Sequence, residues 1–472
     1  AADLATALTQ MAYKYWKTPI LASRPPQDMS PDQDSNYGWG RLTLRVATGF
    51  DGVPPEISIL YPGNGETVLT KTPNILALIK DNKTGVKTVS INLDGVPRTD
   101  FLFDPVKGVL SYTVTSPLST GVHSVSITAE DLAGNVSNAV THTFQVIPPS
   151  VPSGLQMITL PYTNLRNADP LSVFIPLVSG SIKVARWVPS DEQTNKYHVY
   201  PDPWASFAPP DALGSSPIVA GPPAGLGYFV STPGIGSTLL NPQGQTVQSD
   251  EYSISLVRGA VYPQGWNMIG NPYTSAVQWG AVEFVTNGQR QDLVEAVEAG
   301  VTPGIIYEFK NDGQNGYYDF PSDPLAAVMH PFRGYWVHVA KDTKLIVYSP
   351  GVSAAAAPKL ANKPWLSSEV WRLRLVTSAG GWQDPTLFIG AGPGCTSGYD
   401  AGRDVPKPPP LASSLQSYLP KSGWGQYDGA YAQDLRGTNG SQSWNLEVKC
   451  DAPNTLVSLT WPDLNQVVPK GV

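Results

Sequence analysis

The sequence predicts a mainly β protein, a multidomain string of antiparallel β-sandwich units with a short helical N-terminal segment. Three observations indicate this class. The 472 residues include 46 Pro and 44 Gly, which interrupt regular structure too often for long helices. Apolar and polar residues alternate in many short runs, which is the period of a half-buried strand. Similar segments also recur in the same order along the chain, which indicates related modules.

The first predicted element is a helix over residues 2–16. Its apolar residues recur at spacings of three and four, as on one face of a helix. These residues are Leu4, Leu8, Met11, Ala12 and Tyr15. The polar, proline-bearing stretch from Ser23 to Asn36 then predicts a long loop, so residues 1–52 form a separate N-terminal segment.

This segment ends with Tyr37-Gly38-Trp39-Gly40, two glycines that open a short apolar-periodic stretch. With the helix before it, the motif resembles the tail of the catalytic domain of subtilisin-like serine peptidases. The resemblance implies the C-terminal region of a secreted bacterial protein of that family. The family's nucleophilic Ser, in a Gly-Thr-Ser-Met-Ala segment, and its Asp and His would then lie upstream of Ala1. Because a triad needs all three groups within reach, we expect no catalytic residue in this chain and no enzyme activity.

Residues 53–148 predict an antiparallel β-sandwich, because short alternating runs are separated by turn residues. The runs are Ile57, Ile59 and Tyr61; Ile75, Ala77 and Ile79; Val89, Ile91 and Leu93; Tyr112 and Val114; Val125, Ile127 and Ala129; and Val140, His142, Phe144 and Val146. The turn sequences that begin at Asp81 and Ala129 resemble those of bacterial immunoglobulin-like domains of extracellular proteins. An Ig-like domain is therefore expected here.

An internal repeat follows a proline-rich linker at 147–152. The segment at 154–163 is similar to that at 265–274, which lies 111 residues further on, and Gly227-Tyr228-Phe229-Val230 is similar to Gly334-Tyr335-Trp336-Val337. In a third correspondence, each residue is paired with one 120 positions further on. It pairs Trp187, Tyr197, Tyr200 and Pro201 with Tyr307, Tyr317, Phe320 and Pro321. Two β-rich repeat units are therefore predicted, at 153–260 and 261–350. They resemble repeats found in large secreted bacterial proteins.

The second repeat unit contains a predicted helix from Gln291 to Ala299, which Gly300 closes as a left-handed C-cap. After a small-residue linker at 351–363, residues 364–472 predict a C-terminal β-sandwich. A proline-rich loop that includes Lys407 to Pro410 lies between its strands.

Composition excludes several classes of function. Charged residues make up only 15% and the net charge is −7, so the chain offers no basic face for nucleic acid. No apolar run approaches the roughly 18 residues of a membrane span. Low charge, abundant small polar residues and scarce cysteine indicate a secreted or cell-surface protein. Cys395 and Cys450 lack zinc-binding spacing and are a candidate disulfide.

Calcium is the one ion that the sequence suggests, because hard oxygen ligands on turns suit it. The candidates are Asp81, Asp131 and Asn135 in the sandwich, and Asp400 and Asp404 in the C-terminal unit. None of them completes the EF-hand spacing, and stabilisation of turns is the alternative role of such residues. No other cofactor is expected.

Aromatic residues gather in the second repeat unit, where Trp266, Tyr273, Tyr317 and Tyr318 are the candidate glycan-binding residues. Exposed rings stack on the apolar faces of sugars, whereas buried rings fill a β core. Core packing is therefore the alternative for all four.

Three functions agree with these patterns. The first is a non-catalytic extracellular scaffold, adhesion or assembly region of a large secreted subtilisin-like protein. The second is a carbohydrate-binding accessory module with extracellular glycans as partners. The third is a structural cell-surface or filament-forming protein whose copies associate, because exposed sheet edges are templates for pairing.

Overall fold

The chain divides into two compact units, residues 1–51 and 52–472. The computed structural model describes residues 51–147, 150–165, 174–175, 183–200, 223–240, 244–311, 316–350, 370–410, 415–451 and 454–468. The predicted helix at 2–16 and the Tyr37 to Gly40 motif lie outside the described residues, as does the linker at 351–363. The described part is mainly β with antiparallel sheets, which confirms the predicted fold class.

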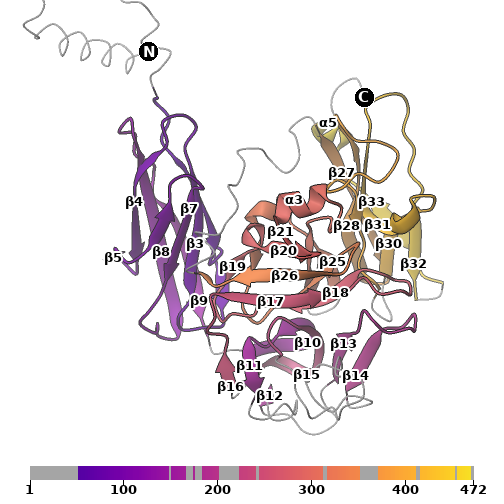
Figure 1. Ribbon diagram of the computed structural model, residues 1–472, viewed down its shortest axis with the longest axis horizontal. Helices are drawn as coiled ribbons and strands as arrows, with labels where there is room; N and C mark the ends of the chain where they lie inside the picture. The colour runs from indigo at the N-terminus through magenta and orange to yellow at the C-terminus, as the bar shows by residue number, and fades with distance from the viewer. Residues whose placement is uncertain are drawn as a thin grey trace, which may run out of the picture. The chain divides into compact units, whose positions relative to one another are not determined.

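The residues from 56 to 146 form a two-layer β-sandwich (Figure 1). Its strands are β1 (Glu56–Tyr61), β2 (Glu66–Val68), β3 (Asn74–Lys80), β4 (Val86–Leu93), β5 (Val96–Arg98), β6 (Leu102–Asp104), β7 (Val109–Thr113), β8 (Gly121–Asp131) and β9 (Val140–Val146). One layer has the order β1-β3-β7-β6 and the other the order β2-β9-β8-β4-β5. Every second residue of β8 is buried, as its alternating sequence predicts, and Ile127 contributes to one apolar core with Tyr61 and Phe144.

The first repeat unit contains seven described strands. They are β10 (Ser150–Thr159), β11 (Tyr162–Leu165), β12 (Phe174–Ile175), β13 (Lys183–Trp187), β14 (Tyr197–Tyr200), β15 (Gly227–Leu240) and β16 (Gly244–Thr246). Four of them form the first repeat sheet, in the order β10-β15-β13-β14, and β12 also pairs with β15. β11 and β16 pair with each other in a separate two-stranded sheet.

The second repeat unit contains ten strands and the helix α3 (Leu293–Glu298). The strands are β17 (Glu251–Leu256), β18 (Trp266–Gly270), β19 (Val277–Gln278), β20 (Glu283–Thr286), β21 (Gln289–Asp292), β22 (Ile306–Asn311), β23 (Gly316–Asp319), β24 (Val328–Met329), β25 (Gly334–His338) and β26 (Thr343–Tyr348). The short helices η4 (Trp279–Ala281) and η5 (Pro324–Ala326) accompany them. The second repeat sheet has the order β18-β25-β22-β23, and a further sheet has the order β17-β26-β20-β21. β17 falls within the range predicted for the first unit, yet it pairs with β26 of the second.

The two repeat sheets have equivalent strand orders and registers. Met157 of β10 pairs with Phe229 of β15, and Met268 of β18 pairs with Trp336 of β25 in the same way. The segments at 154–163 and 265–274 therefore occupy equivalent positions in their two sheets. The same is true of the two Gly-aromatic-aromatic-Val strands. The two segments of the predicted repeat thus share one strand pairing in the structure.

The third correspondence needs a correction of register. Ala185 lies beside Phe229, whereas Tyr307 lies beside Trp336, so Ala185 and Tyr307 are the equivalent positions. Trp187 then corresponds to Phe309, two residues beyond Tyr307. A shift of two residues keeps a side chain on the same face of a strand, so the spacing of aromatics alone could not fix the register.

The two repeat units contact each other reciprocally, like the halves of a symmetric dimer. Thr159 N–H donates to the carbonyl oxygen of Phe332 at 3.2 Å, and the equivalent Gly270 N–H donates to that of Gly225 at 3.0 Å. Gly225 and Phe332 both have positive φ, 78° and 64°. Each unit therefore contributes the same left-handed turn to the other unit, at the end of β10 or of the equivalent strand β18.

Glycines make this close crossing possible. A Cβ atom on Gly227 would lie 2.7 Å from the carbonyl oxygen of Ile269, and one on the equivalent Gly334 would lie 2.8 Å from that of Ile158. A Cβ atom on Gly270 would lie only 2.1 Å from the Cβ of Thr159, its own equivalent. The glycine of each Gly-aromatic-aromatic-Val motif thus leaves room for the backbone of the other repeat unit.

The inner faces of the two repeat sheets share one aromatic core. Phe229 meets Phe309 edge-on with ring centroids 5.2 Å apart, and Trp187 meets Trp336 edge-on at 5.5 Å. Such pairs stabilise by about 0.5–1.5 kcal/mol beyond the area that they bury. The repeat pair is therefore held by both backbone contacts and apolar packing.

The predicted helix is confirmed with a later start. α3 begins at Leu293 because Asp292 caps it, with the Glu295 N–H donating to the Asp292 carboxylate at 2.8 Å and the Glu295 side chain accepting from the Asp292 N–H at 3.0 Å. Leu293 and Val297 are buried, as their spacing predicts. Gly300 has φ +62°, the left-handed conformation expected after the helix.

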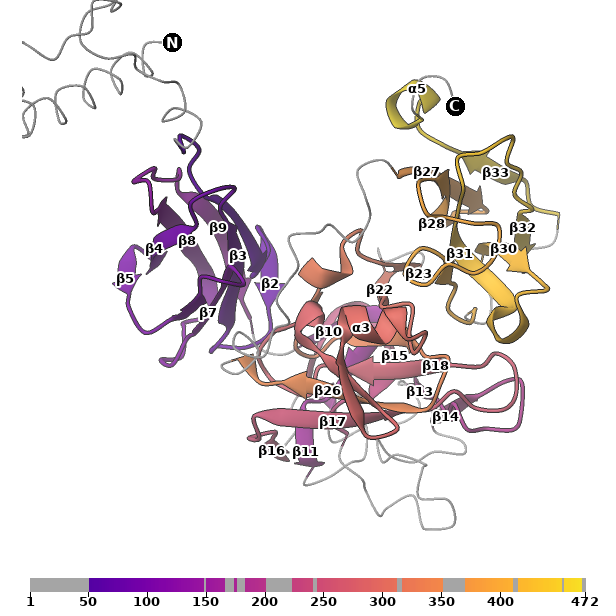
Figure 2. The same ribbon diagram turned by 45° about the horizontal axis from the view of Figure 1, so that its top comes forward.

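The C-terminal strands are connected in one seven-stranded sheet (Figure 2). They are β27 (Trp371–Ala379), β28 (Trp382–Ala391), β29 (Val405–Pro406), β30 (Leu415–Lys421), β31 (Gly429–Arg436), β32 (Glu447–Cys450) and β33 (Val457–Thr460), with the helices η6 (Gly425–Tyr427) and α5 (Leu464–Val467). The order is β32-β30-β31-β28-β27-β33, and β29 pairs with β31. The proline-rich segment packs on the second repeat sheet, where Tyr307 donates to the Pro406 carbonyl at 2.5 Å and Tyr318 to that of Pro409 at 3.4 Å.

Candidate functional site

The sandwich brings two predicted calcium ligands together. Carboxylate oxygens of Asp81 and Asp131 lie within 4.8 Å of each other. The Oδ2 atom of Asp81 accepts from the N–H groups of Lys83 and Gly85, at 3.0 and 2.7 Å. Its Oδ1 atom is enclosed and has no hydrogen-bond partner among the described residues. Closely spaced carboxylate oxygens are what a hard cation prefers, so this pair fits part of a calcium site.

Asn135, the third candidate in the sandwich, orients Asp131. Its N–H and its Nδ2 group both donate to the Asp131 carboxylate, at 2.8 and 2.7 Å. Burial would raise the pKa of Asp131, but the hydrogen bonds from Asn135 and from the backbone of the turn lower that pKa below its ordinary value. Asp131 is therefore ionised at neutral pH. Calcium at this place stays a prediction, with Asp81 and Asp131 as its ligands.

Asp400 and Asp404 stabilise a loop of the C-terminal unit. The N–H of Asp400 donates to Asp404 at 2.7 Å, and the N–H of Leu435 donates to it at 3.1 Å. Burial raises the pKa of Asp404 to about 8, so its carboxyl group is mostly protonated at neutral pH. Calcium at Asp400 and Asp404 stays a prediction, and it would have to displace the proton that Asp404 holds. No third acidic, His or Cys ligand joins the pair within the described ranges.

Three of the four candidate glycan-binding aromatics are core residues. Trp266, Tyr273 and Tyr318 are 4%, 5% and 7% exposed. The Trp266 ring meets that of Trp336 edge-on at 6.0 Å, in the core between the repeat sheets. Tyr317 is half-buried, since it alternates with Tyr318 along β23. Core packing, the alternative for these residues, thus describes all but Tyr317.

The structure contains no disulfide between Cys395 and Cys450, so this predicted pairing is wrong. Cys395 follows β28 and Cys450 ends β32, and the sheet order places β31 and β30 between those strands. Neighbouring strands lie about 4.8 Å apart, whereas a disulfide joins Cα atoms about 4.4–6.8 Å apart. Three strand spacings exceed that reach.

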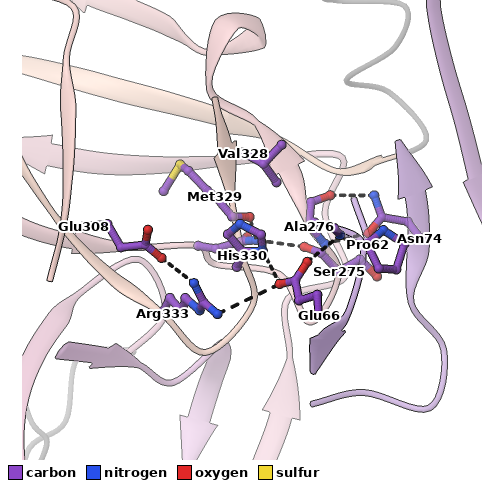
Figure 3. A network of polar contacts seen from close by, with 12 residues as sticks. Pro62, Glu66, Asn74, Ser275, Ala276, Glu308, Val328, Met329, His330 and Arg333 are labelled. Carbon is purple, nitrogen blue, oxygen red and sulfur yellow. Dashed lines mark hydrogen bonds and ion pairs between the residues drawn. The ribbon is translucent and has the colours of Figure 1, made fainter. Parts of the chain in front are cut away.

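A charged network joins the sandwich to the second repeat unit (Figure 3). Glu66 of β2 lies 2.9 Å from Nδ1 of His330 and 3.9 Å from Arg333, which also forms an ion pair with Glu308 of β22. Burial would raise the pKa of Glu66, but the hydrogen bond and charge of His330 and the charge of Arg333 lower it below its ordinary value. We call these four residues the charged joint.

Asn74 of β3 forms the second connection between the sandwich and the second repeat unit (Figure 3). Its Nδ2 group donates to the Ala276 carbonyl oxygen at 2.6 Å, and the Ala276 N–H donates to its Oδ1 atom at 2.6 Å. The Asn74 side chain is fully buried. It therefore pairs with both backbone groups of Ala276 as a neighbouring strand would, and it fixes one register between the two bodies.

A cavity of about 1000 Å³ lies between the repeat pair and the C-terminal sheet. We call it the aromatic cleft, because rings from three distant parts of the sequence line it. They belong to Trp187, Tyr197, Phe229, Tyr262, Trp266, Tyr418, Tyr427 and Tyr431. The sequence predictions missed most of these residues, since no local pattern shows that segments more than a hundred residues apart share one wall.

No protein-family model and no curated protein sequence matches the chain. Similar solved structures include the endo-β-1,4-mannanase from Thermotoga petrophila (17% identity, TM-score 0.18), where the match covers 21% of each chain. The SrpA adhesin from Streptococcus sanguinis is 19% identical over 27% of this chain and 71% of that chain, with a TM-score of 0.19. The SGBP-B protein of a Bacteroides ovatus mixed-linkage glucan utilization locus, in complex with a mixed-linkage heptasaccharide, is 12% identical over 61% of each chain, with a TM-score of 0.16. These scores are too low to carry an argument.

In the part of the chain that the structure describes, no helix is both long and apolar enough to cross a membrane.

Proposed function

We propose that this chain is a non-catalytic extracellular scaffold and adhesion region of a large secreted subtilisin-like protein. A scaffold must hold its surfaces in a fixed relation, and that requires joints that resist rotation. Proline-rich linkers alone provide spacing, but they do not fix an orientation.

The observation that carries the proposal is the pair of connections between the sandwich and the second repeat unit. Asn74 is bonded to Ala276 through two buried hydrogen bonds. The charged joint adds contacts from the Glu66 carboxylate to Nδ1 of His330 at 2.9 Å and to Arg333 at 3.9 Å. Buried groups that lose such partners are costly, at about 1–3 kcal/mol each, so the joint opposes separation of the two bodies. This supports a rigid scaffold in preference to flexibly linked modules.

An Asn74→Ala variant tests the connection between the sandwich and the second repeat unit, and Asn64→Ala is its matched control. Asn64 accepts a hydrogen bond from the Thr143 N–H within the sandwich, so its loss does not touch the joint. In calorimetry, we expect the sandwich and the repeat pair of the wild-type chain to unfold together, and the Asn74→Ala chain to show a separate, earlier transition. A wild-type chain in which the sandwich already unfolds independently would contradict the rigid scaffold.

The relation to subtilisin-like proteins is tested by the sequence of the natural gene upstream of Ala1. We expect that sequence to encode the Asp, the His and the Gly-Thr-Ser segment of the catalytic domain. A gene that lacks all three would reject this part of the proposal, without bearing on the joint.

Self-association is a second candidate function, which β33 favours. This strand pairs with β27 alone, at the edge of the C-terminal sheet, and Val457 and Leu459 are exposed on it. Leu456 and Trp461 beside it are also exposed. Exposed apolar edge strands are templates for pairing between chains. Light scattering at high protein concentration tests this, and a monomer under those conditions would exclude it.

A further inference from the structure

The aromatic cleft has the build of a ligand site. Pockets that bind small ligands are about 300–1,000 Å³, and mainly apolar and aromatic walls carry a few polar groups. Tyr262 lines this cleft with 59% of its surface exposed, whereas Trp187 and Trp266, which also line it, are buried. An exposed Tyr ring presents an apolar face to a ligand and carries a hydroxyl that can form a hydrogen bond.

Polar side chains of both kinds surround these rings. Arg258, Gln264 and Lys449 offer hydrogen-bond donors, and Glu447 and Asp451 offer acceptors. Several of these groups are already oriented by neighbours. Arg258 donates to Gln264 at 2.6 Å. The Tyr418 hydroxyl donates to Glu447.

The charges that line the cleft nearly balance. Arg258 and Lys449 oppose Asp428, Glu447 and Asp451, while the charge of Lys407 is already paired with Asp384 at 2.6 Å. The three carboxylates would repel an anionic ligand, because they outnumber the two cations. Arg258 and Lys449 would repel a cationic ligand. The cleft therefore favours an uncharged ligand that carries apolar faces and many hydroxyl groups.

We propose that the aromatic cleft binds a neutral oligosaccharide, with Tyr262 as a stacking platform and Glu447 and Asp451 as acceptors for sugar hydroxyl groups. This inference deepens the adhesion part of the proposed function, and it names the class of ligand. The ring of Tyr262 matches the apolar face of a pyranose, and the surrounding donors and acceptors match its edge. The connection between Asn74 and Ala276, which carries the scaffold proposal, does not depend on sugar binding.

The test is calorimetric titration of the full chain with neutral hexasaccharides of β-linked glucose, xylose, mannose and N-acetylglucosamine, each to millimolar concentration. We expect at least one to bind, and Tyr262→Ala to weaken that binding at least about tenfold, as truncation of a central aromatic does. Trp461→Ala, which removes an exposed ring outside the cleft, is the control and leaves the affinity unchanged. Circular dichroism confirms that both variants are folded.

Three outcomes of the sugar titrations would overturn the proposal. They are no binding of any of the four sugars, binding that Tyr262→Ala does not change, and binding of only a sulfated or uronate polymer that salt abolishes. A synthetic peptide of residues 203–222, which is rich in proline, forms a further arm. Binding of this peptide at the cleft in place of the sugars would also overturn it. Each of these results leaves the Asn74 experiment to decide the scaffold by itself.

Discussion

A side chain added at Gly270 should disrupt the contact between the two repeat units. In a Gly270→Ala variant the new Cβ atom would lie 2.1 Å from the Cβ and 2.2 Å from the Oγ1 of Thr159. Carbon atoms prefer separations of about 3.5–4.0 Å, so the two strands must move apart by roughly 1.5 Å. Because Gly270 and Thr159 are equivalent positions of the two repeats, only one of them can carry a side chain there.

The cost follows from the packing around this contact. Extra methyl groups in a well-packed core destabilise by about 1–3 kcal/mol, and by more where the backbone itself must shift. Here the shift would also stretch the bond from the Gly270 N–H to Gly225 and that from the Thr159 N–H to Phe332. We therefore expect Gly270→Ala to lower the free energy of unfolding by about 3 kcal/mol or more.

A second substitution should recover this loss. The Thr159 hydroxyl is buried without a hydrogen-bond partner among the described residues, so Thr159→Gly removes a group that contributes little. A glycine within a strand costs about 0.5–1 kcal/mol relative to alanine. The double variant Thr159→Gly with Gly270→Ala should therefore return to within about 1 kcal/mol of the wild-type chain. The two single losses together would be about 4 kcal/mol, so this is a coupling of about 3 kcal/mol.

Urea unfolding followed by tryptophan fluorescence measures these differences, because Trp187, Trp266 and Trp336 lie in the shared core. Gly398→Ala is the control, since its Cβ would meet nothing closer than 3.6 Å. If Gly270→Ala were as stable as wild type, or if Thr159→Gly failed to rescue it, the reciprocal contact would be refuted.

Three further predictions concern charge and metal. Burial and the charge of Arg258 lower the pKa of His338 from 6.5 to about 4, so between pH 6.5 and 4 the unfolded chain binds a proton that the folded chain does not. The free energy of unfolding should therefore fall by roughly 3 kcal/mol as the pH drops through this range. Urea unfolding at each pH measures this loss, which should be smaller in His338→Gln. Lys407→Met should lower the free energy of unfolding by about 3–5 kcal/mol, because it leaves Asp384 buried without its cation. Adding Asp384→Asn to this variant should recover part of the stability in thermal melts. A Lys407→Met chain as stable as wild type would mean that the pair is not buried. Added calcium should raise the melting temperature of wild type but not of Asp131→Asn, and a wild-type chain that responds to neither calcium nor a chelator would reject the metal.

Local pattern predicted the elements of this fold well. The alternation in Ile57, Ile59 and Tyr61 and that around Ile127 appear in β1 and β8 with the expected faces buried. The helix ended before Gly300 as its composition predicted. These features depend on residues a few positions apart, which a sequence displays directly.

Contacts between distant segments could not be predicted in the same way. The sequence displayed the glycines of both Gly-aromatic-aromatic-Val motifs, but their purpose depends on Ile158 and Ile269 of the opposite repeat. Tyr262 and Glu447 share a cleft although they are far apart in the chain. The clustering of aromatic residues in the sequence suggested that Trp266 binds glycans. In the structure the neighbouring rings pack on Trp266 and bury it.

Native-state hydrogen exchange at two backbone amides tests the central claim most directly, that the repeats form one body through reciprocal contacts. The Thr159 and Gly270 N–H groups each donate across the repeat boundary, to Phe332 and Gly225. Since one opening of the pair breaks both bonds, the two amides should exchange slowly, with matching protection, and Gly270→Ala should reduce both together. Fast exchange of either amide, or loss of protection at one and not the other, would contradict this account.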